Sequence, residues 1–155
     1  NIVSNFLPSV LNYLNVNFEN TNQIVLGASM GGLMSIKTSI LFPQFRNIIS
    51  LSPAFWFGYP RVLYDVKNLS NESSTYLYTG KKEGHIFGDH VKNIFPNNWD
   101  LDFSNNDDFY YSGVKNIKES LDSNNKKVIF SFQDNGSHNE TSWAAAILEI
   151  LGKLI

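Results

Sequence analysis

The sequence contains no cysteine among its 155 residues. This absence excludes disulfide bonds, a thiolate nucleophile and a zinc site built on cysteine. Long apolar runs are also missing, because the longest stretches, residues 48–51 and 143–148, fall far short of the roughly 20 residues that a helix needs to cross a bilayer. The sequence therefore predicts no membrane span, and it leaves the cellular compartment open.

An excess of positive charge is absent as well. The chain has 12 basic and 14 acidic side chains, and its formal net charge is −2. Without a broad positive field nothing drives binding along a phosphate backbone, so we do not expect nucleic acid as a partner. Hydrophobic residues make up 43% of the chain and aromatic residues 14%, which is too much for a disordered polypeptide. We therefore expect residues 1–155 to form a single domain with its own core.

Short apolar runs alternate along the chain with segments in which apolar residues recur at helical spacing. The runs predict strands at residues 23–27, 47–51, 75–79 and 127–133. The helical spacing predicts helices at residues 7–18, 30–41, 111–121 and 144–154, the last with Ala144, Ile147, Leu148, Leu151 and Leu154 facing inward. Strands that alternate with amphipathic helices are typical of a parallel sheet covered on both faces. The sequence therefore predicts an α/β fold, with an irregular excursion at residues 84–108.

The segment 27–32, Gly-Ala-Ser-Met-Gly-Gly, joins a predicted strand to a predicted helix. A serine hydroxyl is a weak nucleophile, and it has to be lifted clear of the backbone to reach both a base and a substrate carbonyl. A sharp strand-to-helix turn achieves this, and small residues such as Gly27 and Gly31 on either side keep the crossing chain segments apart. We predict that Ser29 is a nucleophile and that the amide of Met30 donates to an oxyanion; the alternative is a flexible turn.

The base has three candidates, the histidines His85, His90 and His138. His138 follows the fourth predicted strand, at the edge of a parallel sheet where functional groups gather, and Ser29 occupies the same end of its own strand. We predict that His138 accepts the serine proton; the alternative is a histidine on a solvent-facing loop. The acid should follow a strand between the two, and Glu83 fits best. Its rivals are Asp89, the nearest, and the loop residues Asp100, Asp102, Asp107 and Asp108.

A metal site has one candidate cluster, formed by His85, Asp89 and His90. These side chains offer nitrogen and oxygen donors, but their spacing matches no recognised site and no further ligand is evident. We therefore expect neither a metal nor another cofactor.

The aromatic residues Phe55, Trp56 and Phe57 follow the second predicted strand. Together with Trp99 they are candidates for an acyl or aryl pocket, with the hydrophobic core as the alternative.

Four segments, in order along nearly the entire chain, resemble the esterase family of α/β-hydrolases. They are residues 27–32, 52–57 (Ser-Pro-Ala-Phe-Trp-Phe), 80–83 (Gly-Lys-Lys-Glu) and 138–143 (His-Asn-Glu-Thr-Ser-Trp). This family includes enterochelin (trilactone siderophore) esterases, feruloyl and acetyl esterases, S-formylglutathione hydrolases and mycolyltransferases. The resemblance implies a three-layer α/β-hydrolase sandwich with Ser29 as nucleophile, Met30 as an oxyanion donor, Glu83 as acid and His138 as base. S-formylglutathione hydrolases usually carry a histidine where Ala28 stands, which counts against that substrate.

One departure from the family is large. The first strands of its members, with the loop that supplies a second oxyanion amide, have no counterpart in this chain, which begins with Asn1 instead of methionine. We therefore expect the last four strands of the fold, the C-terminal part of a longer protein. The nucleophile strand would then lie at an apolar edge, which invites pairing with the missing N-terminal half or with a second chain.

The predicted function is that of a serine esterase, which hydrolyses a small-molecule or polysaccharide-linked carboxylic ester through an acyl-enzyme. We expect this activity of the longer protein to which the chain belongs, and less of residues 1–155 alone. One alternative is an acyltransferase of the same family, in which an alcohol or sugar replaces water. The other is a hydrolase-like binding module without catalysis.

Overall fold

The computed structural model describes residues 9–10, 12–13, 23–89, 91, 95, 99 and 101–154. Its strands are β1 (Ile24–Ala28), β2 (Asn47–Leu51), β3 (Ser74–Lys82) and β4 (Lys127–Ser137). Its helices are α2 (Met30–Leu41), α3 (Arg61–Asp65), α4 (Asn106–Ser123) and α5 (Glu140–Leu154). Three short 3₁₀ turns join them, η1 (Phe55–Phe57), η2 (Val66–Asn68) and η3 (Gly84–Phe87).

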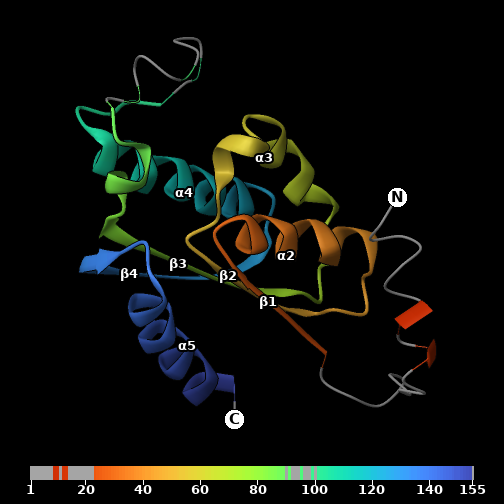
Figure 1. The fold of residues 1–155 in the computed structure, drawn as a ribbon. Coiled ribbons are helices and arrows are strands. Elements are labelled where there is room, and N and C mark those ends of the chain that lie inside the picture. Colours follow the sequence, from red (N-terminus) through yellow and green to blue (C-terminus); the bar gives the residue numbers. More distant parts are fainter. Residues whose placement is uncertain are drawn as a thin grey trace.

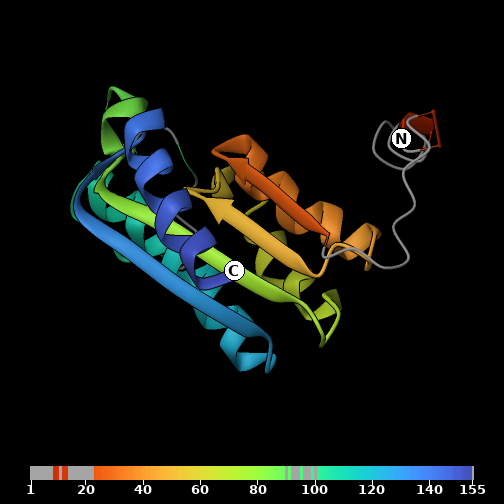
Figure 2. The ribbon, with the colours of Figure 1, turned by 90° about the horizontal axis from the view of Figure 1, so that it is seen from below.

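The four strands form one sheet in the order β1-β2-β3-β4, and every neighbouring pair is parallel. Helices α2, α3 and α4 cover one face of the sheet and α5 lies on the other (Figure 1). The view from below shows α5 crossing the sheet on this second face (Figure 2). The predicted α/β fold is therefore confirmed, with helices covering both faces of a parallel sheet in three layers.

Two hydrophobic cores hold these layers together. The larger lies between the sheet and α2, α3 and α4, and its buried side chains include Ile36, Ile48, Leu77 and Val114. The smaller lies under α5, where Ile150 packs among the other buried residues of this cluster. Strands β2 and β3 contribute to both cores, because successive side chains of a strand point to opposite faces.

Helix α4 begins inside the segment that was expected to be irregular. The side chain of Asn105 accepts a hydrogen bond from the amide of Asp108 and so caps the helix, and Asp107 and Asp108 lie in its first turn. Both features favour a helix start, because the first amides lack partners within the helix and carry partial positive charge. The helix α3 was not predicted, since five residues are too few to reveal a helical period.

The last helix differs from its prediction in the side that it buries. Ala146 and Ile150 are buried in α5, whereas Ala144 is exposed and Leu148 is 73% exposed. The expectation that Ala144 and Leu148 face inward was wrong, because the apolar stripe of this helix is wider than the strip of sheet that it covers. The side chain of Leu154 and most of the predicted helix at 7–18 lie outside the described residues.

In the described part of the chain, strand β4 is one of the two edges of the sheet and strand β1 is the other. Its side chains Ile24 and Leu26 are 41% and 46% exposed. The pairing of this edge with further strands or with a second chain stays a prediction. Among the described residues, no helix has both the length and the apolar character of a membrane span.

A pair of matched substitutions tests the larger core. Leu77→Ala removes a side chain of the central strand β3 that is 0% exposed, so it should lower the free energy of unfolding by about 2–5 kcal/mol. Leu148→Ala makes the same change at an exposed position and should alter it by less than about 0.5 kcal/mol. Chemical denaturation of the two variants measures both values. Equal losses would contradict the burial described for these two residues.

Candidate active site

Each of the four strands is followed immediately by a polar residue of the candidate site. Ser29 follows β1, Ser52 follows β2, Glu83 follows β3 and His138 follows β4. Because the strands are parallel, these four residues lie at the same edge of the sheet.

The backbone of Ser29 forms the sharp turn between β1 and α2. Its φ and ψ angles are 55° and −121°, a conformation that is unfavourable for a residue with a side chain. Two hydrogen bonds hold the turn against the end of β2: the Ser29 amide donates to the Leu51 carbonyl at 2.9 Å, and the Ala54 amide donates to the Ser29 carbonyl at 2.9 Å. The strained turn is therefore fixed by the neighbouring strand.

The glycines around Ser29 contribute unequally to this turn. A Cβ atom on Gly27 would lie 2.2 Å from the carbonyl oxygen of Gly31, so strand and helix can cross only without a side chain there. A Cβ on Gly32 would lie 2.7 Å from the Leu51 carbonyl oxygen. A Cβ on Gly31 itself would meet nothing within 4 Å. A side chain is thus sterically excluded at Gly27 and Gly32. The expectation that Gly31 also keeps the crossing chain segments apart was wrong.

The imidazole of His138 lies between the serine and the acid. Its Nε2 is 2.9 Å from Ser29 Oγ, and its Nδ1 is 2.9 Å from Glu83 Oε2. A carboxylate only accepts hydrogen bonds, so Nδ1 carries the proton in this contact. The Nε2 of the neutral ring is then free to accept the hydroxyl proton of Ser29. The structure thus brings together the three side chains that were predicted to form the triad.

The end of β4 reaches this position because it lies directly against the end of β3. A Cβ on Gly80 would lie 2.1 Å from the carbonyl oxygen of Gly136, so the two strands touch backbone to backbone. The register shifts at this point, with Gly80 opposite Gln133 but Lys82 opposite Ser137. This bulge brings the end of β4 next to the residue before Glu83, and His138 follows directly.

The carboxylate of Glu83 is 0% exposed and fully hydrogen-bonded. Its Oε1 accepts from Ser52 Oγ at 2.6 Å and from the Gly80 amide, and its Oε2 faces His138. Such donors replace the water that a buried anion loses. Burial, together with the negative charge of Glu83, raises the pKa of Tyr78 to about 12 and that of Tyr110 well above its ordinary value. Both phenols therefore remain neutral near neutral pH.

The rival acids have other surroundings. Asp89 and Asp102 are exposed, Asp107 accepts from the Gly84 amide at 2.7 Å, and Asp108 belongs to the cap of α4. Asp100 lies outside the described residues. Among the acids that the structure describes, Glu83 is the one hydrogen-bonded to His138.

The predicted oxyanion donor Met30 is the first residue of α2. Its amide has no carbonyl four residues earlier within the helix, and the positive end of the helix dipole lies there. The position suits an oxyanion donor, and the role stays a prediction.

The three aromatic residues of η1 have different surroundings. Phe55 is buried in the larger core, where its ring packs against Phe109 at 5.1 Å, so it offers no surface to a ligand. Trp56 is half-buried and Phe57 is 68% exposed. Trp99 packs against the same core. Of the predicted pocket residues, Trp56, Phe57 and Trp99 retain accessible surface.

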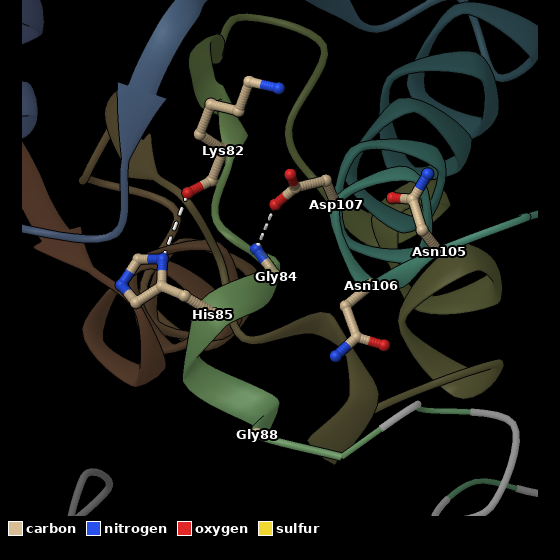
Figure 3. Close-up of a pocket in the computed structure, with 7 residues that line it drawn as sticks. All are labelled: Lys82, Gly84, His85, Gly88, Asn105, Asn106 and Asp107. Atoms are coloured by element: carbon tan, nitrogen blue, oxygen red, sulfur yellow. Dashed lines mark hydrogen bonds between the residues drawn. The ribbon is translucent and has the colours of Figure 1, made fainter.

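Two open hollows lie between the end of β3 and the start of α4. The larger, of about 600 Å³, is lined by Lys82, Gly84, His85, Gly88, Asn105, Asn106 and Asp107 (Figure 3). The other, of about 470 Å³, is lined by Lys81, Lys82, Asn105, Asp107, Asp108, Tyr111, Asp134 and Asn135. The Gly84 amide donates to Asp107 Oδ1 at 2.7 Å, so the turn after β3 is tied to the first turn of α4 between these hollows' lining residues.

The candidate metal cluster does not assemble in the described part of the chain. His85 Nδ1 donates to the carbonyl of Lys82 at 3.1 Å, as Figure 3 shows, and Asp89 is exposed. His90 lies outside the described residues. Among the residues that the structure covers, no group of three or more His, Asp or Glu side chains could hold a metal ion.

Three residues of the site were not predicted from the sequence. Ser52 binds Glu83, Trp143 donates from Nε1 to Ser52 Oγ at 3.0 Å, and Tyr110 donates to the Ser52 carbonyl at 2.6 Å. Ser52 and Trp143 do lie in two of the four segments that carry the family resemblance. Their positions at the ends of those segments were the available signal, but their partners depend on the fold.

Comparison with solved structures identifies a similar fold. The crystal structure of the enterobactin esterase FES from Shigella flexneri, determined in the presence of enterobactin, matches with a TM-score of 0.61 and 17% sequence identity. The match covers 96% of this chain and 34% of that chain, so this chain spans about a third of the neighbour's length. No model of a protein family matches the sequence, and neither does any curated protein. The likeness shows the α/β-hydrolase fold.

Two alanine substitutions within the same turn test the contact between β1 and α2. Gly27→Ala forces a Cβ against the backbone of Gly31, so it should lower the free energy of unfolding by about 1–3 kcal/mol or more. Gly31→Ala meets nothing within 4 Å and should raise it by up to about 1 kcal/mol, because alanine favours a helix over glycine. Thermal or chemical denaturation measures both. Losses of similar size in the two variants would overturn this account of the turn.

Proposed function

We propose that the protein is a serine hydrolase that cleaves carboxylic esters through Ser29, His138 and Glu83. The observation that carries the proposal is the continuous contact from Ser29 Oγ to His138 Nε2 and from His138 Nδ1 to Glu83 Oε2, each at 2.9 Å. A hydroxyl within hydrogen-bond reach of a base that is itself oriented by a carboxylate is the arrangement that nucleophilic catalysis requires. The fold likeness to an esterase supports the ester as substrate class.

The first half of the reaction acylates the serine. Ser29 Oγ attacks the ester carbonyl carbon while its proton passes to His138 Nε2, and the carbonyl electron pair moves onto the oxygen. The amide of Met30 donates to this oxyanion. The bond to the alcohol then breaks, and His138 returns the proton to the leaving oxygen. Glu83 stabilises the imidazolium that exists between these two steps.

The second half returns the free enzyme. A water molecule gives a proton to His138 Nε2 and attacks the acyl carbon, and the bond between this carbon and Ser29 Oγ breaks. The imidazolium then returns its proton to the serine, and the carboxylic acid leaves. We propose a small-molecule or polysaccharide-linked ester as the substrate, with Trp56 and Phe57 as the accessible aromatic surface near η1.

A fluorophosphonate probe, which reacts with activated serines, tests the nucleophile. The protein that carries these residues should be labelled and should hydrolyse p-nitrophenyl acetate, and Ser29→Ala should abolish both. Ser123→Ala removes an exposed hydroxyl at the end of α4 and should leave both unchanged. Mass spectrometry of the labelled peptide locates the modified residue.

Several outcomes would count against the proposal. Labelling that survives Ser29→Ala would place the reactive serine elsewhere. A folded protein that is neither labelled nor active on esters would favour the binding module. Ester products that form only when an alcohol acceptor is added would favour the acyltransferase.

A further inference from the structure

The carboxylate of Glu83 has two oxygens, and only Oε2 faces the imidazole. We infer that Ser52, oriented by Trp143, is the positioning residue that holds the carboxylate of Glu83 with one oxygen directed at His138. The inference rests on the proposed function, because it assigns a role to two residues that lie one contact away from the proposed triad.

The backbone of Ser52 is held in an unfavourable conformation. Its φ angle is 41°, in the left-handed region that residues with a side chain seldom adopt. The Ser52 amide donates to the Tyr78 carbonyl at 2.7 Å, and the Ser52 carbonyl accepts from the Tyr110 hydroxyl at 2.6 Å. The peptide groups on both sides are therefore pinned. Strain of this kind persists where the surroundings require one orientation of a side chain, and it concentrates at functional sites.

The hydroxyl of Ser52 has a defined direction because of Trp143. The indole Nε1 is a donor only, and it lies 3.0 Å from Ser52 Oγ, so the serine oxygen accepts this bond. The single hydroxyl proton of Ser52 then points to Glu83 Oε1, which lies 2.6 Å away. Ser52 is the donor toward Glu83 because a carboxylate only accepts, and Trp143 occupies a lone pair of the same serine oxygen.

The two oxygens of Glu83 bind different donors. The Ser52 hydroxyl and the Gly80 amide both donate to Oε1, which leaves Oε2 for His138. Charge-assisted hydrogen bonds of this kind are about twice as strong as neutral ones. Without Ser52, one amide alone holds Oε1, and the carboxylate is free to turn about its terminal bond away from the imidazole.

The same indole also touches the base. The rings of Trp143 and His138 are 4.9 Å apart at 84°, an edge-to-face contact. Both residues belong to the segment that leaves β4 and enters α5, so one side chain fixes the imidazole on one side and the serine that holds its acid on the other. This double contact is why we assign Trp143 and Ser52 to one unit.

A proton signal tests the inference independently of turnover. In nitrogen-15 histidine-labelled protein, the Nδ1 proton of His138 should give a far-downfield resonance that is protected from exchange and disappears in His138→Gln. We expect Ser52→Ala to shift or broaden this resonance and Trp143→Phe, which keeps an aromatic ring, to do so to a smaller extent. Ser50→Ala is the matched control, because it removes another buried hydroxyl from the end of β2, one that donates to the Gly32 carbonyl.

Kinetics supply the second readout. We expect Ser52→Ala to lower kcat by roughly 10-fold or more while KM stays within about 2-fold, because the lost hydrogen bond acts on the charged form of the triad. In a Glu83→Gln background, the same substitution should lower kcat by less than about 2-fold, because a residue that acts through the acid has nothing left to act on. If Ser52 had only a structural role, Ser52→Ala would lower kcat by the same factor in both backgrounds.

The two readouts separate this inference from the proposed function. An unchanged resonance in Ser52→Ala, an equal change in Ser50→Ala, or additive losses in the Glu83→Gln background would overturn it. A resonance that responds as expected in a protein without esterase activity would support the positioning role while rejecting the proposed function.

Discussion

The arrangement of the site depends on one buried negative charge. The carboxylate of Glu83 is fully enclosed, and an anion in such a place is stable only when hydrogen-bond donors replace the water around it. Its donors come from three different strand ends: Gly80 from β3, Ser52 after β2 and His138 after β4. The charge therefore ties these ends together, because a displacement of any of them would leave the carboxylate short of a donor.

Strand β2 connects this charge to Ser29, the proposed nucleophile. The Leu51 carbonyl at its end accepts from the amide of Ser29, and the next residue, Ser52, binds the acid. Two consecutive residues, the last of β2 and the one that follows it, thus contact the turn of Ser29 and the carboxylate of Glu83. Both Ser29 and Ser52 have positive φ angles, so these two strained residues lie next to the contacts that orient the proposed nucleophile and acid.

The bounds of β2 and α2 could be predicted from the sequence, because they follow from the apolar period and from the glycines after β1. Ser29, Glu83 and His138 could be found because each directly follows a strand. Contacts between distant segments could not: the exposed side of α5 depends on how much sheet the helix covers. The same holds for Gly32, where a side chain would collide with the carbonyl oxygen of Leu51 in a neighbouring strand.

By itself the sequence determined which residues are available at the edge of a parallel sheet, since local pattern decides where each strand ends and which residue comes next. Only the tertiary structure decided how these residues pair. The contact of Glu83, and not of the neighbouring aspartates, with His138 requires the close approach of β3 and β4, and the second partner of the Ser52 hydroxyl is an indole 91 residues away in the chain. Hydrogen bonds depend on distance and angle in space, and spacing along a chain does not contain that information.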